Sequence, residues 1–266
     1  MKQRVISAAV ALAIFIPIFI IGGITFNVAV YVLTILGLRE FINARQKEKN
    51  VLDFIKLISY LMISLYYFSN TLDGSLNFTI DYRLVAGMFL TLFIPVVFYH
   101  DDDIYGIKDA FYLLGGVFFL GSSMSLFSMY RNLGMELIIF LFLITMMTDS
   151  FAYFGGRLIG KNKLLESISP NKTWEGTICG SVVGTFICTV YYVTVINSQV
   201  NLFEIVGIIF FLSLVGQFGD LFFSAIKRRY KIKDFSNIMP GHGGVLDRLD
   251  SIIFVMLTFT FFLEIL

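Results

Sequence analysis

The sequence predicts an all-α fold, that of a polytopic integral membrane protein with about nine transmembrane helices. Three observations lead to this fold class: the composition, the length of the apolar runs and the distribution of positive charge along the chain. Hydrophobic residues make up 57% of the 266 residues and charged residues only 15%, whereas soluble domains contain about 45–50% apolar and about 25% charged residues. The mean hydropathy of +0.82 has the same implication, because a soluble core does not bury so large a share of apolar side chains.

The apolar residues are gathered in long runs. A helix that crosses a bilayer needs roughly 20 mainly apolar residues, and residues 5–38 contain no charge, with Gly22-Gly23 as an interruption. The basic start is interpreted as a retained first span, because no small-residue cleavage site followed by a soluble domain comes after it. The expected spans are Val5–Ile21, Phe26–Ile42, Phe54–Phe68, Leu84–Tyr99, Ala110–Phe127, Glu136–Phe154, Gly176–Ile196, Phe203–Phe223 and Ser251–Leu266.

The positive charges are distributed asymmetrically between the two sides of this topology. Lys and Arg collect in short cytoplasmic loops of membrane proteins. With the N-terminus in the cytoplasm, eighteen basic residues fall in inner segments and only Arg83 and Arg131 in outer ones. This asymmetry supports an odd number of spans and a C-terminus outside, so we expect a multi-pass protein of the cell (inner) membrane.

We expect a single integral membrane unit, with N-terminal spans in residues 1–135 and a membrane-spanning catalytic region in residues 136–266. Two polar loops in the second part, residues 155–175 and 226–250, hold half of the basic residues and face the cytoplasm in this topology. Lys47–Lys49 is interpreted as a contact with anionic lipid, and Asp101–Asp103 as a solvated loop. The net charge of +1 does not indicate a partner, and no nucleic-acid partner is expected.

Carboxylates at membrane depth are the first candidates for a site. Asp149 interrupts the sixth expected span and Asp220 lies near the inner end of the eighth. A carboxylate inside a span is costly, so it usually faces a cavity or a partner and marks function. On a helix Asp220 shares a face with Ser224 and with Lys227 or Arg228.

Asp247 and Asp250 are three residues apart at the entrance of the last span, so they also share a helix face. Taken alone, Asp247 is equally well read as a helix-start residue that the helix dipole favours. Together with Asp220 and the nearby Lys and Arg residues, these aspartates indicate a hard cation that bridges carboxylates to phosphate oxygens. Mg²⁺ prefers such ligands.

The stretch PGHGGVLDRLD surrounds Asp247 with groups suited to phosphate. Glycine backbone approaches a phosphate closely, so Gly243 and Gly244 are expected to point N–H groups at one, and the helix that follows adds its positive end. His242 is a candidate for phosphate binding or proton transfer, although a lone loop histidine is more often merely polar.

The other polar loop contains SPNKTWEG. Lys172 with Thr173 can hold a phosphate, while Ser169 and Asn171 are alternative N-cap or turn residues. Capping is the default reading of Thr173 and Glu175, whereas phosphate binding is favoured for Lys172.

Two other patterns are set aside. The nearby GGRLIGKN lacks the hydroxyl residue that ends a Walker-type phosphate loop and follows a span rather than a buried strand. The two cysteines lie in one apolar run and indicate packing rather than a disulfide or zinc site.

Three segments together resemble the phosphatidate cytidylyltransferase (CDP-diacylglycerol synthase) family: DSFAYFGGRLIGK, SPNKTWEG and SAIKRRYKIKDFSNIMPGHGGVLDRLD. The last contains every fixed element of the family signature, and the resemblance is sharp from about residue 149 onward. The matching signature residues are Ser224, Lys227, Arg228, Lys233, Asp234, Pro240, His242, Gly243, Gly244, Asp247, Arg248 and Asp250.

The resemblance implies an all-helical membrane enzyme, a homodimer, that joins CTP to phosphatidic acid and releases CDP-diacylglycerol and pyrophosphate. By analogy Asp220 and Asp247 hold Mg²⁺ with Asp250 close by, and a second cation such as K⁺ can share the site. Lys172, Lys227, Arg228 and Arg248 are the expected phosphate contacts. The other substrate-binding candidates are Ser169, Asn171, Thr173, Ser224, Lys233, Asp234, Gly243 and Gly244, and the catalytic set is Asp220, Asp247, Asp250, Lys172 and His242.

Two alternatives remain. A CTP-dependent polyprenol kinase would also bind a cation and phosphate groups. It would need a base to activate the hydroxyl of its substrate, and His242 or Asp234 could serve as that base. A transporter would explain intramembrane aspartates but not two phosphate-type loops on one side, and the paired broken helices of transporters are not evident.

Overall fold

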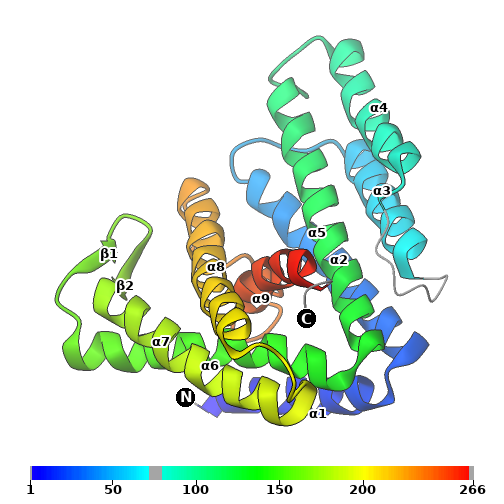
Figure 1. Ribbon diagram of the computed structural model, residues 1–266. Helices are drawn as coiled ribbons and strands as arrows, with labels where there is room; N and C mark the ends of the chain where they lie inside the picture. Colours follow the sequence, from blue (N-terminus) through cyan, green and yellow to red (C-terminus); the bar gives the residue numbers. More distant parts are fainter. Residues whose placement is uncertain (1, 72–79, 264–266) are drawn as a thin grey trace. The chain divides into compact units, whose positions relative to one another are not determined.

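The computed structural model describes residues 2–71 and 80–263, and that part of the chain contains nine α-helices and a two-stranded sheet (Figure 1). The helices are α1 Lys2–Ile21, α2 Gly23–Arg45, α3 Asp53–Thr71, α4 Tyr82–Tyr99, α5 Ile107–Leu133, α6 Met135–Ile159, α7 Trp174–Tyr191, α8 Leu202–Arg229 and α9 Leu246–Phe259. The strands are β1 Lys163–Leu165 and β2 Ser169–Thr173. A π-helical turn, Tyr192–Ile196, extends α7, and a 3₁₀ turn, Thr260–Phe262, extends α9.

Each of the nine expected spans overlaps a helix among the described residues, and the all-α polytopic membrane fold is confirmed. Six helices among the described residues are long and apolar enough to cross a membrane: α2, α4, α5, α6, α7 with its π-helical turn, and α8. Helix α9 has 14 residues, which corresponds to about 21 Å at 1.5 Å per residue. It begins at Leu246, so Asp247 lies in its first turn, in agreement with the helix-start reading of Asp247. The last three residues of the expected final span, 264–266, lie outside the described residues.

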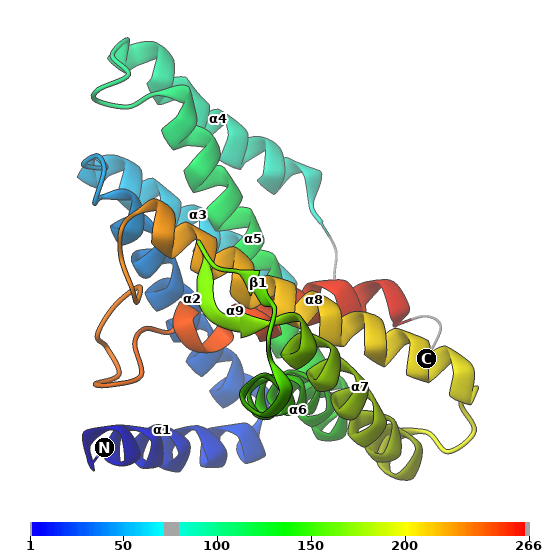
Figure 2. The ribbon, with the colours of Figure 1, turned by 90° about the vertical axis from the view of Figure 1, so that its left-hand side faces the viewer.

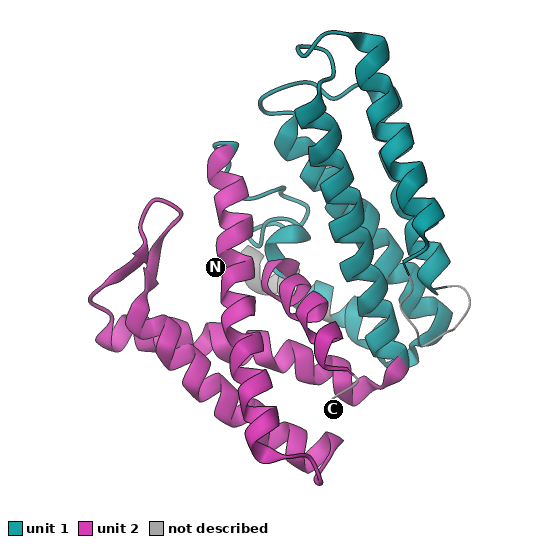
Figure 3. Ribbon diagram, turned by 45° about the horizontal axis from the view of Figure 1, so that its top comes forward, with its two compact units in different colours: residues 1–132, 230–248 teal, residues 133–229, 249–266 magenta. Residues whose placement is uncertain are grey.

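The chain divides into two compact units (Figure 3). The first unit comprises residues 1–132 and 230–248, and the second comprises residues 133–229 and 249–266. The loop between α8 and α9, residues 230–245, therefore belongs to the unit formed by the N-terminal helices, although its sequence motif adjoins α8.

In the first unit, the predicted break between the first two spans is confirmed at Gly22 and Gly23. Both glycines have positive φ values, 66° and 56°, a conformation that glycine adopts without steric cost. Arg131 of α5 reaches this corner, where it donates hydrogen bonds to the carbonyl oxygens of Phe19 (2.8 Å) and Ile20 (3.0 Å). A Cβ atom on Gly22 would lie 2.8 Å from that guanidinium, which can shift, so glycine is required here by its positive φ.

Hydroxyl groups join α3 to its neighbours in the core of the first unit. Tyr66 and Ser122 share a hydrogen bond of 2.9 Å, and Tyr67 pairs with Ser128 at 2.6 Å while donating to the carbonyl oxygen of Asn27 at 2.7 Å. Both tyrosines are fully buried. Hydrogen bonds of this kind between helices are a common means of association where lipid removes the hydrophobic driving force.

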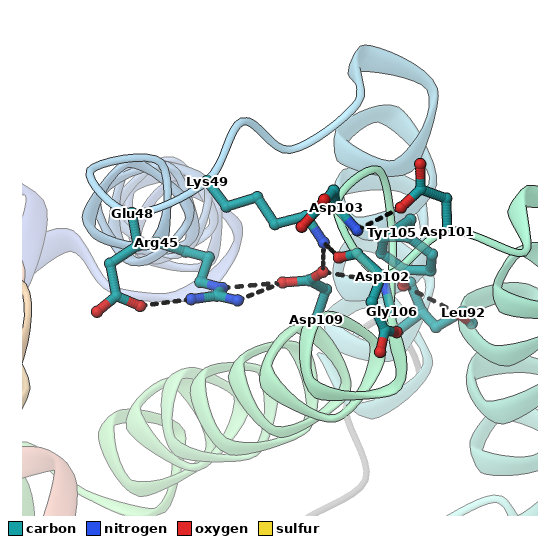
Figure 4. A network of polar contacts seen from close by, with 10 residues as sticks. All are labelled: Arg45, Glu48, Lys49, Leu92, Asp101, Asp102, Asp103, Tyr105, Gly106 and Asp109. Carbon is teal, nitrogen blue, oxygen red and sulfur yellow. Dashed lines mark hydrogen bonds and ion pairs between the residues drawn. The ribbon is translucent and has the colours of Figure 1, made fainter.

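The end of α2 is fixed by a cluster of charges around Asp109 (Figure 4). Asp109, 3% exposed, accepts hydrogen bonds from Arg45 Nε (2.9 Å) and Arg45 Nη2 (2.7 Å), from the Gly106 amide (3.0 Å), and from Lys49. Lys49 also donates to the carbonyl oxygen of Asp102. Lys49 thus forms an ion pair within the protein, where the sequence indicated a contact with lipid.

In the second unit, glycines let α7 pack closely against α6, its neighbour in Figures 1 and 2. Gly176, Gly180 and Gly184 recur every four residues and so line one face of α7. A Cβ atom on Gly176 would meet the Ala152 carbonyl oxygen at 2.6 Å, and one on Gly180 would meet the Thr148 carbonyl oxygen at 2.4 Å. Such small-residue stripes allow close backbone approach between membrane helices.

Glycine has the same role between α8 and α9. A Cβ atom on Gly219 would lie 2.8 Å from the Asp250 carbonyl oxygen and 2.9 Å from the Phe254 ring. The close approach brings Asp220, the next residue of α8, to the level of Asp250 in α9.

Candidate active site

A small hairpin, which the sequence did not predict, places Lys172 at the start of α7. Strands β1 and β2 pair antiparallel, with Lys163 opposite Thr173 and Leu165 opposite Ser169. Lys163 Nζ donates to the Pro170 carbonyl oxygen at 2.6 Å. The hairpin thus holds the SPNKT segment in a defined conformation.

Two side chains join the hairpin to α7. Thr173 Oγ accepts a hydrogen bond from the Gly176 amide at 3.2 Å, which confirms its predicted role as N-cap. The Glu175 carboxylate accepts hydrogen bonds from the Lys161 amide (3.1 Å), the Asn162 amide (3.2 Å) and Asn162 Nδ2 (2.7 Å). Glu175 therefore closes the base of the hairpin.

Lys172 and Asp220 form an ion pair within the second unit. Their side chains are 22% and 28% exposed. Ser224, one turn further along α8, donates a long hydrogen bond of 3.4 Å to Asp220 Oδ1, as the predicted common face of Asp220 and Ser224 requires. Among the described residues Lys172 Nζ has no hydrogen bond of regular geometry, so its stabilisation comes mainly from the charge of Asp220.

Further charges surround this pair. Asp250 interacts electrostatically with Asp220, Lys227 and Asp149, and Asp149 interacts with Lys172 and Asp220. We call these five residues of the second unit the carboxylate cluster: Asp149, Lys172, Asp220, Lys227 and Asp250. It joins residues from α6, β2, α8 and α9, and three carboxylates outnumber its two cations.

The remaining candidates of the second unit lie outside the cluster. Arg228 is exposed and its Nε donates to the Ile168 carbonyl oxygen of the hairpin at 3.2 Å. Ser169 and Asn171 alternate with Lys172 along β2, and successive side chains of a strand point to opposite faces. The hydroxyl of Thr173 is engaged in the N-cap. The structure therefore does not place these three β2 residues on the face that carries Lys172.

The loop of residues 230–245, called here the signature loop, is organised by a residue that the sequence did not single out as a site residue, Glu40. Its carboxylate is buried, at 1% exposure for the residue, and accepts hydrogen bonds from Ser236 Oγ (2.6 Å), the Val245 amide (2.9 Å) and the Leu246 amide (2.9 Å). In the sequence Glu40 was only one of two charges at the end of a span.

Asp247 also stabilises the signature loop, through two other backbone amides. Its Oδ2 accepts hydrogen bonds from the Phe235 amide at 2.8 Å and the Gly244 amide at 2.9 Å. Arg248 is exposed, and its Nε donates to the His242 carbonyl oxygen at 2.8 Å. Asp247 belongs to the first unit and Asp250 to the second, but both lie in α9, three residues apart and so on one helix face.

In this structure the amides of the glycine-rich part of the signature loop donate within the protein. The His242 and Gly243 amides donate to the Met239 carbonyl oxygen at 2.8 and 3.1 Å, and the Gly244 amide donates to Asp247. The start of α9, expected to offer its positive end to phosphate, is instead next to the Glu40 carboxylate. The acceptors for amides 242–246 are thus the Met239 carbonyl oxygen and the carboxylates of Asp247 and Glu40.

An open polar depression of about 650 Å³ lies in the first unit. It contains Lys233 and Asp234 of the signature loop, both predicted substrate-binding residues, and Lys47 beyond the end of α2. Its other lining residues are Asn43, Ala44, Gln46, Ile232, Phe235, Ser236 and Asn237. Cationic and amide side chains give it the character of a site for a polar, anionic ligand.

The described residues contain no preformed group of three His, Cys, Asp or Glu side chains with the geometry of a metal site. The carboxylate cluster nevertheless has the donor type that Mg²⁺ prefers. Mg²⁺ is commonly bound by one or two carboxylates together with substrate phosphates and waters. The excess of carboxylates over cations in the cluster fits a cation that arrives with its substrate.

Comparison with known proteins identifies the family of the chain. Residues 2–266 match the model of the cytidylyltransferase family. The chain is 34% identical over 257 residues to the phosphatidate cytidylyltransferase of Staphylococcus haemolyticus, a match that covers 96% of each chain. It is 33% identical, with the same coverage, to the proteins of that name from Staphylococcus aureus and Staphylococcus saprophyticus. The chain therefore belongs to the cytidylyltransferase family of CTP-using transferases.

Proposed function

We propose that the protein is a phosphatidate cytidylyltransferase of phospholipid biosynthesis. It transfers CMP from CTP to phosphatidic acid and yields CDP-diacylglycerol and pyrophosphate. The observation that carries this proposal is the ion pair between Lys172 and Asp220. It joins Lys172 of the SPNKTWEG motif to α8, the helix that leads into the signature segment, in one charged cluster. Near-full-length similarity to proteins named phosphatidate cytidylyltransferase supports the choice of substrates.

This reaction requires neutralisation of the negative charges of the substrates more than it requires proton transfer. A phosphate oxygen of phosphatidic acid forms a new bond to the α-phosphorus of CTP, and the bond from that phosphorus to the bridging oxygen of pyrophosphate breaks. The attacking oxygen is already ionised at neutral pH, so no strong base is needed. The main obstacle is repulsion between two polyanions, which Lys and Arg side chains lower electrostatically.

Lys172, Lys227, Arg228 and Arg248 are the proposed phosphate contacts. Lys172 and Lys227 belong to the carboxylate cluster, and Arg228 follows Lys227 on α8. Lys172 has a second role in this proposal: it neutralises Asp220 until substrate arrives, and then exchanges a carboxylate for a phosphate oxygen.

Asp220, Asp247 and Asp250 are proposed to hold Mg²⁺, and a second cation such as K⁺ is proposed to share the site. When bound, Mg²⁺ neutralises phosphate oxygens and helps to align the two substrates. The support from the structure is the carboxylate-rich cluster around Asp220 and Asp250, together with the common helix face of Asp247 and Asp250.

The membrane character of the chain suggests how each of the two substrates reaches the site. We propose that phosphatidic acid enters from the lipid phase and CTP from the cytoplasm, with the N-terminus inside and the C-terminus outside. Lys233 and Asp234 in the polar depression are proposed CTP contacts. We also propose a homodimer, which light scattering of the detergent-solubilised protein tests.

The proposal is tested with purified protein in mixed micelles, given Mg²⁺, CTP and either phosphatidic acid or a free polyprenol. Formation of lipid-linked CDP from phosphatidic acid is expected, with release of one pyrophosphate per lipid product. Incorporation from the polyprenol but not from phosphatidic acid would instead identify a polyprenol kinase.

A further inference from the structure

The signature loop is tied to helix α2 by one buried side chain, Glu40. It lies near the cytoplasmic end of α2 in the predicted topology and is 1% exposed. Its Oε1 accepts hydrogen bonds from Ser236 and from the Val245 amide, and its Oε2 accepts one from the Leu246 amide. The carboxylate thus holds both ends of residues 236–246.

The buried charge of Glu40 is stabilised by three hydrogen-bond donors and by its position at the start of a helix. A buried carboxylate is tolerated only when it is hydrogen bonded or paired. The two backbone amides belong to the beginning of α9, where the helix dipole favours negative charge. Glu40 therefore occupies the place at which an external anion would otherwise be expected.

The surrounding residues are shaped to admit this carboxylate. A Cβ atom on Gly244 would lie 2.3 Å from Glu40 Oε1 and 2.5 Å from its Cδ. One turn earlier in α2, a Cβ atom on Gly37 would lie 3.3 Å from the fully buried Leu246. Two glycines thus allow α2 and the start of α9 to approach each other around Glu40.

The hydrogen bonds of Glu40 and Asp247 meet in the same short segment. The Gly244 amide donates to Asp247, while the next two amides donate to Glu40. Ser236, the third donor to Glu40, is a wall residue of the polar depression and adjoins Phe235, whose amide also donates to Asp247. A shift of Glu40 therefore moves both the carboxylate of Asp247 and one wall of the depression.

We propose that Glu40 is the positioning residue of the signature loop: from α2 it fixes the start of α9 and so determines where the Asp247 carboxylate lies. Glu40 itself touches no substrate in this account. The inference rests on the proposed function for its effect on turnover, whereas its effect on the loop is independent of that function.

The test compares Glu40→Gln and Glu40→Ala with wild type, and uses Glu48→Gln as the control. Glu48 lies just beyond the same helix, is 33% exposed and pairs with Arg45. Glutamine keeps the size of Glu40 but turns an NH₂ group toward an amide donor. Hydrogen exchange of the amides of residues 244–246 is expected to rise at least tenfold in both Glu40 variants and to stay unchanged in Glu48→Gln.

Kinetics distinguish positioning from mere loss of folded protein. A smaller folded fraction lowers kcat without altering the Mg²⁺ dependence, whereas a displaced Asp247 alters both. For Glu40→Gln we expect a roughly 100-fold fall in kcat, the scale of a misplacement of about 1 Å. The Mg²⁺ concentration for half-maximal activity is expected to rise about tenfold, equivalent to a 1.4 kcal/mol loss of cation affinity.

A double-mutant cycle tests the contact between Glu40 and Gly244 without a measurement of enzyme activity. Gly244→Ala alone is expected to destabilise the protein, because its Cβ would clash with Glu40. In the Glu40→Ala background the clash is gone, so Gly244→Ala should lower the unfolding temperature much less.

Three experimental outcomes would overturn different parts of the proposal. Additive effects in the cycle, or wild-type exchange at residues 244–246 in Glu40→Gln, would overturn the role of Glu40. An unchanged Mg²⁺ dependence with reduced kcat would overturn its link to Asp247. If wild-type protein transfers no CMP to phosphatidic acid, the proposed function fails, while exchange and the cycle still decide the role of Glu40 in the loop.

Discussion

Lys172 of strand β2 and Asp220 of helix α8 form an ion pair in the second unit. Neither side chain is more than 28% exposed, so the pair is shielded better than a surface salt bridge. Asp149 and Asp250 add two carboxylates within electrostatic range. The pair is thus the centre of a charged cluster rather than an isolated contact.

Asp220→Asn is expected to lower kcat by roughly 100- to 1,000-fold, the scale for removal of one group that stabilises the transition state electrostatically. The variant keeps the side-chain shape but removes the charge that faces Lys172. Initial rates of lipid-linked CDP formation measure the effect. Asp53→Asn is the matched control, since Asp53 is exposed and pairs with Lys56, three residues away on the same helix. More than half of wild-type activity in Asp220→Asn would remove Asp220 from the site.

Lys172→Ala is expected to raise the KM for CTP or for phosphatidic acid about tenfold, which corresponds to 1.4 kcal/mol of lost binding free energy. The reason is that the variant loses a phosphate contact and leaves the Asp220 charge unneutralised. Separate titrations of the two substrates identify which one Lys172 binds. Lys161→Ala serves as the comparison, because Lys161 is exposed outside the cluster. Unchanged KM values for both substrates would leave Lys172 with a structural role only.

A comparison of Asp247→Asn with Asp247→Ala distinguishes the role of Asp247 in turnover from its role in stability. Asparagine retains an oxygen that can accept the Phe235 and Gly244 amides, so Asp247→Asn is expected to keep the wild-type unfolding temperature and lose turnover. Alanine leaves both buried donors without an acceptor and is expected to cost about 1–3 kcal/mol per donor in unfolding free energy. Near-normal activity of Asp247→Asn at saturating Mg²⁺ would exclude Asp247 as a cation ligand.

Gly180→Ala tests the close packing of α6 and α7. Its Cβ atom would meet the Thr148 carbonyl oxygen at 2.4 Å, so the helices must separate, at a cost of about 1–3 kcal/mol. Thermal unfolding in detergent measures the loss. Gly207→Ala in α8, whose Cβ would meet nothing within 4 Å, should be neutral or stabilising. Equal stability of the two variants would contradict a packing role for Gly180.

Most of the fold was predictable because lipid imposes a simple pattern on sequence. Long apolar runs, broken by Gly22-Gly23 and by polar loops, marked every helix, and Thr173 was recognised as an N-cap from its place before α7. The carboxylates could be selected because a charge at membrane depth is costly. These signals are local, so one sequence suffices to read them.

The contacts that organise the site depend on tertiary structure and were harder to predict. Glu40 has no local motif, and its role appears only when α2 packs against the start of α9. The glycines at 243 and 244 predict a loop that binds phosphate, whereas in the structure the Gly243 amide donates to the Met239 carbonyl oxygen and the Gly244 amide to Asp247. The sequence predicts a loop in place of the hairpin at residues 163–173, since the two strands are short and polar.

The most direct test of the account follows the phosphorus atoms of CTP. Wild-type protein is given Mg²⁺, phosphatidic acid and CTP labelled in either the α- or the γ-phosphate, with Asp220→Asn in parallel. We predict that wild-type protein places the α-label in the lipid product and the γ-label in released pyrophosphate, and that Asp220→Asn forms both products much more slowly. Appearance of γ-label in lipid, or the absence of any labelled lipid from wild-type protein, would contradict it.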